Sequence, residues 1–134
     1  MVKWQGLSKR KPSGGRRWFL RSKRKFEYGR EPAHTKLGEL KRKLIRTRGG
    51  DKRYKLFQTT KVNVFDPKKK KSFVSEIEVV EKTPASRHFK RSNIITKSAI
   101  IKTKLGYAEV TNRPGQDGQI QAILVDYTPE KKKR

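Results

Sequence analysis

The feature that most constrains this chain is the segment of residues 9–38, in which basic and aromatic side chains alternate closely. Residues 9–30 hold ten Lys or Arg against a single acid, Glu27. The aromatic residues among them are Trp18, Phe19, Phe26 and Tyr28. Such a density of like charge opposes compaction without a partner. We expect an arm that is coil by itself and becomes ordered on an RNA surface. The alternative is an arm that only keeps the chain soluble, although solubility requires no aromatic residues.

The composition of the whole chain points to a polyanionic partner. Its 134 residues carry a formal net charge of +25, and 31% are hydrophobic, which predicts one small domain with an extension. Nucleic acid and an anionic membrane are the candidates. No apolar run approaches the ~20 residues that span a bilayer, and no basic segment has a clean amphipathic helical face. We therefore predict a nucleic-acid partner and no membrane partner. The absence of cysteine excludes disulfides and thiolate metal sites.

The pattern changes after residue 40 to short β-branched runs separated by turn residues. Residues 41–48 and 52–59 flank Gly49-Gly50-Asp51, which predicts a hairpin. Further strands are expected at 61–65, 72–81, 93–96, 99–104, 107–111 and 119–126. Many short strands without a convincing helix predict an all-β fold, a small antiparallel β-barrel-like body. The expected division is a basic N-terminal extension at 1–40, the body at 41–127 and a short basic C-terminal tail at 128–134.

The clearest expected strand, residues 72–81, alternates apolar and acidic side chains. Phe73, Ile77 and Val79 are expected on one face, with Glu76 and Glu78 on the other. Because acids repel phosphate, we expect the acidic face to turn away from the nucleic acid.

Basic loops in the body predict contacts from several sides. Lys68–Lys71 is one, Arg87–Arg91 is a compact basic loop around Phe89, and Lys131–Arg134 closes the chain. Proteins that bind duplex DNA usually insert a helix into the major groove. Since no helix is expected here, a folded RNA is the favoured target.

Two glycine-containing motifs have different expected roles. In Ser13–Arg17 the glycines let the backbone approach a phosphate and the arginines can pair with it, the alternative being a flexible spacer. Gly115–Gly118 matches the GXXG loop of KH domains, but it lies between strand-like segments instead of helices, so we predict a tight turn.

No enzymatic signature is present. His34 and His88 are the only histidines, and no triad, paired carboxylates or set of about three metal ligands accompanies them. We predict no catalytic residue, no metal and no cofactor. A remaining alternative is an RNA-processing enzyme that uses these two histidines.

Several stretches resemble the S8e family of archaeal and eukaryotic small-subunit ribosomal proteins. They are residues 3–6, 11–17, 23–35, 48–50, 93–97 and 111–118. They run in the family's order from residue 3 to about 125, and Ser98 stands where the family's pattern has glycine. The compact length resembles the archaeal form. The resemblance implies a β-barrel-like body with a basic extension, bound to small-subunit rRNA in the cytoplasm beside neighbouring ribosomal proteins.

The candidate RNA-binding residues come from two sources. The resemblance implies contacts from Lys11, Ser13, Gly14, Gly15, Arg16, Arg17, Lys23, Arg24, Lys25, Arg30, Asn93 and Lys97. Side-chain chemistry adds Lys9, Arg10, Trp18, Arg21, Arg87, His88, Lys90 and Arg91. We expect no homo-oligomer. The alternative function is a small basic DNA-packaging protein with a β-rich body.

Overall fold

The computed structural model describes residues 3–47 and 49–128. Contacts divide the chain into two compact units, Met1–Pro32 and Ala33–Arg134, which are described separately below. No helix in these described ranges is long and apolar enough to cross a membrane. The predicted basic tail, residues 128–134, lies outside the described residues except for Thr128.

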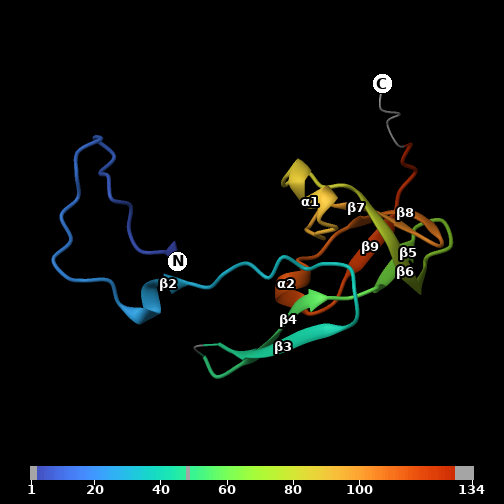
Figure 1. Ribbon diagram of the computed structural model, residues 1–134, viewed down its shortest axis with the longest axis horizontal. Coiled ribbons are helices and arrows are strands. Elements are labelled where there is room, and N and C mark those ends of the chain that lie inside the picture. The colour runs from blue at the N-terminus through green and yellow to red at the C-terminus, as the bar shows by residue number, and fades with distance from the viewer. Residues whose placement is uncertain (1–2, 48, 129–134) are drawn as a thin grey trace. The chain divides into compact units, whose positions relative to one another are not determined.

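The second unit contains a closed barrel of five strands, in the order β5-β6-β7-β8-β9 (Figure 1). The strands are β5 (Lys61–Asp66), β6 (Lys71–Lys82), β7 (Ile100–Thr103), β8 (Gly106–Val110) and β9 (Gln121–Leu124). Neighbouring strands are antiparallel except β5 and β9, which pair in parallel and close the barrel. The prediction of a small all-β, barrel-like body is confirmed.

The core of the molecule fills this barrel. On β5 the alternation is strict, with Val62 and Val64 almost fully buried and the residues between them exposed. Ile101 of β7 and Val110 of β8 pack in the same buried cluster. Burying each such side chain contributes about 1.5–3 kcal/mol. The apolar alternation of short strands therefore specifies the body.

Strand β6 departs from the predicted faces. Ile77 is buried as expected, but Phe73 and Val79 are 40% and 42% exposed. The register with β7 shifts between Ile77 and Val79, so the inward position moves to Val80, which is fully buried. Phe73 lies where β6 pairs only with β5, before its pairing with β7 begins at Ile77. The predicted alternation was therefore wrong for Val79, whereas Phe73, opposite the buried Val64 of β5, stays on the face of Ile77.

The predicted hairpin is present but forms its own sheet. β3 (Lys41–Arg46) pairs antiparallel with β4 (Lys52–Gln58), separately from the barrel (Figure 1). Leu56 of β4 joins the barrel core, and the one-turn helix α2 (Pro114–Asp117) lies against β4. Gly118 ends α2 with φ +74°, and a Cβ there would lie 2.5 Å from Cβ of Tyr54. A glycine is thus required for this close approach.

Three local predictions in the body were wrong. Arg87–Arg91 is a short helix, α1, because Ser86 caps it by accepting a hydrogen bond from the His88 backbone N–H at 3.3 Å. The turn expected at 115–118 is part of α2 and its C-terminal residue. Residues 93–96 form no strand but only one bridge, Lys36 with Ile94, since a left-handed Asn93 (φ +48°) bends the chain.

The body includes residues before Lys41. The backbone N–H of Lys36 donates to Phe57 O at 2.9 Å, and that of Ile95 donates to Thr35 O at 2.8 Å. The Thr35 hydroxyl is buried and donates to Leu56 O. Residues 33–37 thus pair with β4 and the 93–95 segment. That the body folds independently from residue 41 stays a prediction. A truncated chain should keep residues 33–37, because they make these hydrogen bonds with the body.

Candidate nucleic-acid interface

Most of the basic arm is coil and turn, as expected, but its two ends pair with each other. β1 (Lys3–Trp4) pairs antiparallel with β2 (Tyr28–Gly29), and the backbone N–H of Gln5 donates to Glu27 O at 2.8 Å. The 3₁₀ helix η1 (Lys25–Glu27) precedes β2. The residues between the two strands therefore form a loop whose ends are tied together.

The single acid of residues 9–30 organises this loop. The Glu27 carboxylate accepts hydrogen bonds from the Trp4 indole at 3.2 Å, the Arg24 backbone N–H at 3.1 Å and the Arg21 guanidinium at 2.7 Å. The Arg24 backbone, the Trp4 indole and the charge of Arg21 together lower the pKa of Glu27. Because the ionised carboxylate holds three segments together, its charge supports the shape of the arm.

A small turn presents the Ser13–Arg17 motif. The backbone N–H of Lys11 donates to Gly15 O, and that of Gly14 to Lys11 O, both at 2.9 Å. Gly14 has φ +83°, which this turn requires. Gly15 has no such requirement: the nearest atom to a Cβ there would be Ser13 Oγ at 3.8 Å. The chain's own packing thus leaves the Gly15 backbone open to approach from outside.

The candidate residues of the arm lie at its surface. The exposed ones are Lys9, Arg10, Lys11, Ser13, Gly14, Gly15, Arg16, Trp18, Arg21, Lys23, Arg24, Lys25 and Arg30. Arg17 is half-buried. Arg21 is also engaged internally with Glu27, and the Lys23 ammonium lies 5.7 Å from the centre of the Trp4 ring. The structure thus gathers these cations on one loop with aromatic rings among them.

The candidates Arg87, His88, Lys90 and Arg91 share one turn of helix α1. All four are exposed, and together with Val79 and Val80 they line a hollow of about 630 Å³. Lys90 is held by an ion pair with Glu81 at 3.1 Å. Phe89, expected at the centre of the basic loop, is half-buried with its ring edge-on to His34, 5.4 Å between centroids.

The last two candidates differ from each other. Lys97 is exposed, whereas the side-chain oxygen of Asn93 accepts a hydrogen bond from the Val80 backbone N–H at 3.4 Å. Its left-handed backbone and this bond give Asn93 a role within the fold. Ser98, which replaces the glycine of the family pattern, has φ +59°, so glycine suits the position for a conformational reason.

The β3–β4 hairpin is a basic surface that the sequence analysis did not include among candidate sites. Its exposed cations are Lys41, Arg42, Lys43, Arg46, Lys52 and Arg53. Lys43 lies opposite Lys55 and Arg46 opposite Lys52 across the strands, so like charges face each other on the hairpin. Arg42 also lies over the Tyr54 ring, 5.2 Å from its centre. The basic run Lys41–Arg46 carries this signal in the sequence, although it was interpreted only as a strand.

Acids on β6 pair with Lys102 of β7 and with Lys104, which follows that strand. Glu78 pairs with Lys102 at 2.9 Å and Glu76 with Lys104 at 2.5 Å. Hydrogen bonds and charge from these carboxylates raise the pKa of both lysines, and Lys104 lowers the pKa of Glu76. This face therefore offers phosphate less net charge than the arm or the hairpin does. Within the described ranges, no three His, Asp or Glu side chains lie together as a metal site.

Comparisons with known proteins identify the family of this chain. The family described as ribosomal protein S8e matches residues 4–125. The small ribosomal subunit protein eS8 of Methanosarcina barkeri is 46% identical over 125 residues, covering 93% of this chain and all of that protein. The eS8 protein of Methanococcoides burtonii gives the same identity and coverage. Both organisms are archaea, as the compact length led us to expect. The chain belongs to the ribosomal protein S8e family.

Proposed function

We propose that this protein is a structural, non-catalytic component of the small ribosomal subunit in the cytoplasm. It binds folded small-subunit rRNA through the arm, the β3–β4 hairpin and helix α1. Membership of the S8e family and the eS8 relatives support the place in the ribosome. The distribution of charge supports the mode of binding.

The observation that carries the proposal is the arm's organised surplus of charge. Residues 3–32 contain eleven Lys or Arg and two acids, a net charge of +9. One of these acids, Glu27, is used internally by three donors. Arginine forks suit bidentate contacts with phosphate, and an open backbone at Gly15 suits a phosphate that lies close to the chain.

Sedimentation and competition test this function. We expect the protein in the small-subunit fraction of an extract at low salt, and we expect structured small-subunit rRNA to displace duplex DNA from it. With 6–10 phosphate contacts, affinity should fall by roughly 10³–10⁵ between about 50 and 200 mM salt. Preferential retention of duplex DNA would instead support the DNA-packaging alternative and contradict the proposal.

We assign an uncharged face of the barrel to a neighbouring ribosomal protein. Phe65, Phe73, Val74 and Ile123 are exposed around a shallow hollow of about 410 Å³ that has no charged lining residue. Charge depletion of this kind is typical of the centre of a protein interface and unsuited to phosphate. We expect Val74→Lys to reduce incorporation into the subunit while leaving affinity for naked rRNA unchanged. Incorporation equal to that of the wild type would contradict the assignment. The assignment would also fail if the wild type self-associates and Val74→Lys abolishes this, because the face would then join two copies of this chain.

A further inference from the structure

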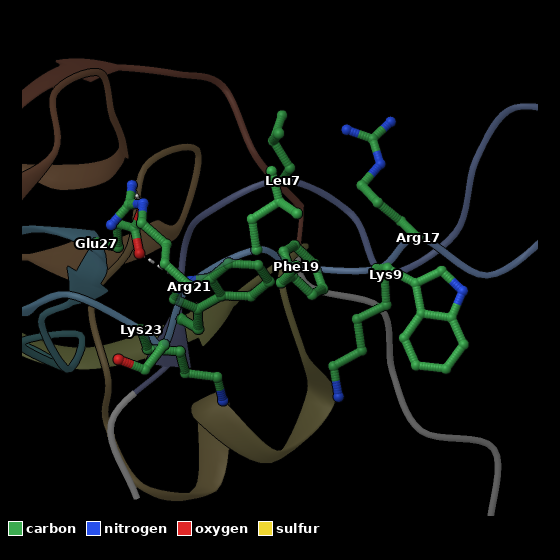
Figure 2. Close-up of a pocket in the computed structure, with 11 residues that line it drawn as sticks. Leu7, Lys9, Arg17, Phe19, Arg21, Lys23 and Glu27 are labelled. Carbon is green, nitrogen blue, oxygen red and sulfur yellow. Dashed lines mark hydrogen bonds and ion pairs between the residues drawn. The ribbon is translucent and has the colours of Figure 1, made fainter.

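The arm contains a hollow with an apolar middle and cationic sides. Its volume is about 750 Å³, within the range of small-molecule sites. Figure 2 shows Leu7 and Phe19 in the middle, with Arg21 and Glu27 to one side and Lys9 and Arg17 to the other. Trp4, Trp18, Leu20, Ser22 and Lys23 complete the lining. Apolar surface and cations thus meet within a single loop.

The aromatic part of the hollow is held in place. The Trp4 and Phe19 rings meet edge-on, 4.9 Å between centroids and 83° between planes. The Trp4 indole is fixed by its hydrogen bond to Glu27, and a Cβ on Gly6 would collide with the Trp4 ring. Position 6 therefore accepts only glycine without displacing Trp4. By contrast, Trp18 is 84% exposed and Leu20 fully exposed at the edge.

The charges of the hollow favour an anionic occupant. Four cations line it against one carboxylate, and that carboxylate already accepts three hydrogen bonds. Arg21 is paired with Glu27, which leaves Lys9, Arg17 and Lys23 as the lining cations not paired with it. A phosphate alone would leave the exposed ring of Trp18 without a stacking partner. An apolar peptide would leave the cations without counter-charge.

We propose that this hollow binds one unpaired nucleotide of RNA, its base stacked on the aromatic rings and its flanking phosphates on Lys9 and Arg17. A base offers a flat π-face to an aromatic ring, and its backbone supplies the negative charge. Bases inside a double helix are covered by their neighbours, so the site selects a bulge or a loop. This inference rests on the proposed rRNA-binding function and specifies what the arm recognises.

The chain supplies its own optical probe for the test. It has two tryptophans, Trp4 and Trp18, and both line the hollow. The experiment titrates the full chain with two RNA hairpins of equal length, one fully paired and one with a single bulged adenine. We expect the bulged hairpin to quench the tryptophan fluorescence and to bind more tightly than the paired one.

Substitution of the exposed ring separates stacking from charge. Trp18→Ala should weaken binding of the bulged hairpin by roughly ten- to a hundredfold and leave the paired hairpin within about twofold. Trp18→Phe should restore most of the loss, and Trp18→Leu should not, since leucine is apolar but has no π-face. The control is Leu105→Ala, an exposed apolar residue of the second unit that lies outside the hollow. It should leave both affinities unchanged.

The outcomes distinguish this inference from the proposed function. If the two hairpins quench and bind alike, or if Trp18→Ala lowers both affinities equally, the hollow is not a base site. Small-subunit rRNA would then still bind the wild type in preference to duplex DNA, and the proposed function would stand. If the wild type prefers duplex DNA, the proposed function itself fails. Rescue by Trp18→Leu would also overturn stacking, because burial alone would then suffice.

Discussion

The body and the arm are held in shape by different kinds of interaction. All thirteen buried hydrophobic residues of the described chain lie between Leu56 and Ala122, whereas the described residues before Ala33 bury only Gly29. The arm instead relies on one short strand pair and the hydrogen bonds of Glu27. Apolar burial gives the body a stability that depends little on salt or pH. The arm's order depends on a single ionised group among repelling cations, which makes it responsive to an anionic partner.

The largest expected effect comes from separating the two regions. Deletion of residues 1–32 should lower affinity for small-subunit rRNA by at least about a hundredfold, since it removes eleven basic residues, and should reduce the salt slope. The body should remain folded because its core lies entirely beyond the cut. Filter binding and circular dichroism measure the two results. A deletion that also removed Thr35 would damage the body, since its hydroxyl bonds Leu56 O. Unchanged affinity after the cut at residue 32 would show that the arm is not the main contact.

Gly118→Ala should damage the body alone. Its left-handed backbone and the 2.5 Å approach to Tyr54 predict a loss of about 2–4 kcal/mol in the free energy of unfolding. Chemical denaturation measures this loss. Gly49→Ala is the matched control, because it has no positive φ and nothing closer than 4.0 Å, and it should change stability little. A tolerated Gly118→Ala would contradict the close packing of β4 on the end of α2.

Gly15→Ala should affect the arm's function without affecting stability. The chain offers ample space for a methyl group there, so any loss must come from the partner. We expect affinity for rRNA to fall several-fold, on the order of 1 kcal/mol, with an unchanged melting temperature. Equilibrium binding and a thermal scan check both. If affinity is unchanged, Ser13–Arg17 acts as a spacer, the alternative reading of the motif.

The smallest effect concerns Ser98 in the body. Replacing Ser98 with glycine should remove the strain of its left-handed backbone (φ +59°), which stabilises the folded state. The greater conformational entropy of glycine in the unfolded chain opposes part of this gain. We expect a gain of about 0.5 kcal/mol in the free energy of unfolding and no change in rRNA affinity. Denaturation of Ser98→Gly beside the wild type measures it. A loss of stability would show that the serine side chain contributes more than its backbone conformation costs.

Apolar periodicity predicted the body better than the arm. The alternation at Val62 and Val64, the hairpin around Gly49-Gly50 and the barrel class follow from short-range patterns, and the structure confirms them. Val79 was predicted on the wrong face because the strand register shifts between Ile77 and Val79, and no local sequence pattern indicates this shift. The short helix at Arg87–Arg91 was missed because one turn is too short for a periodicity, although Ser86 is a recognisable cap.

The contacts between the two ends of the arm were missed for a different reason. Trp4 and Glu27 are 23 residues apart, and their hydrogen bond leaves no trace in composition or periodicity. Glu27 was counted only as the minority charge, yet it is the residue on which the loop depends. The candidate RNA contacts in the arm came from charge and from the family resemblance, and they remain predictions about which residues touch the RNA.

The pH dependence of the arm follows from the same residue. The pKa of Glu27 is lowered in the folded arm, so its contribution is present above the unfolded value of 4.5 and is lost as pH falls through the lower folded value. We expect the fluorescence of Trp4 to change in acid, because its indole donates a hydrogen bond to the Glu27 carboxylate. The circular dichroism of the barrel should not change. Glu27→Gln should remove this acid transition, and persistence of the transition in the variant would assign it to another group.

Glu27→Gln at neutral pH tests the central claim most directly, because shape and charge predict opposite signs. The variant makes the arm more positive by one charge, so an arm that acted only as a cation would bind small-subunit rRNA more tightly. If the loop held by Trp4, Arg21 and Arg24 matters, the variant should bind several-fold more weakly in spite of its added charge. Weaker binding with an intact barrel is the predicted result. Equal or tighter binding would contradict an arm organised by its single acid.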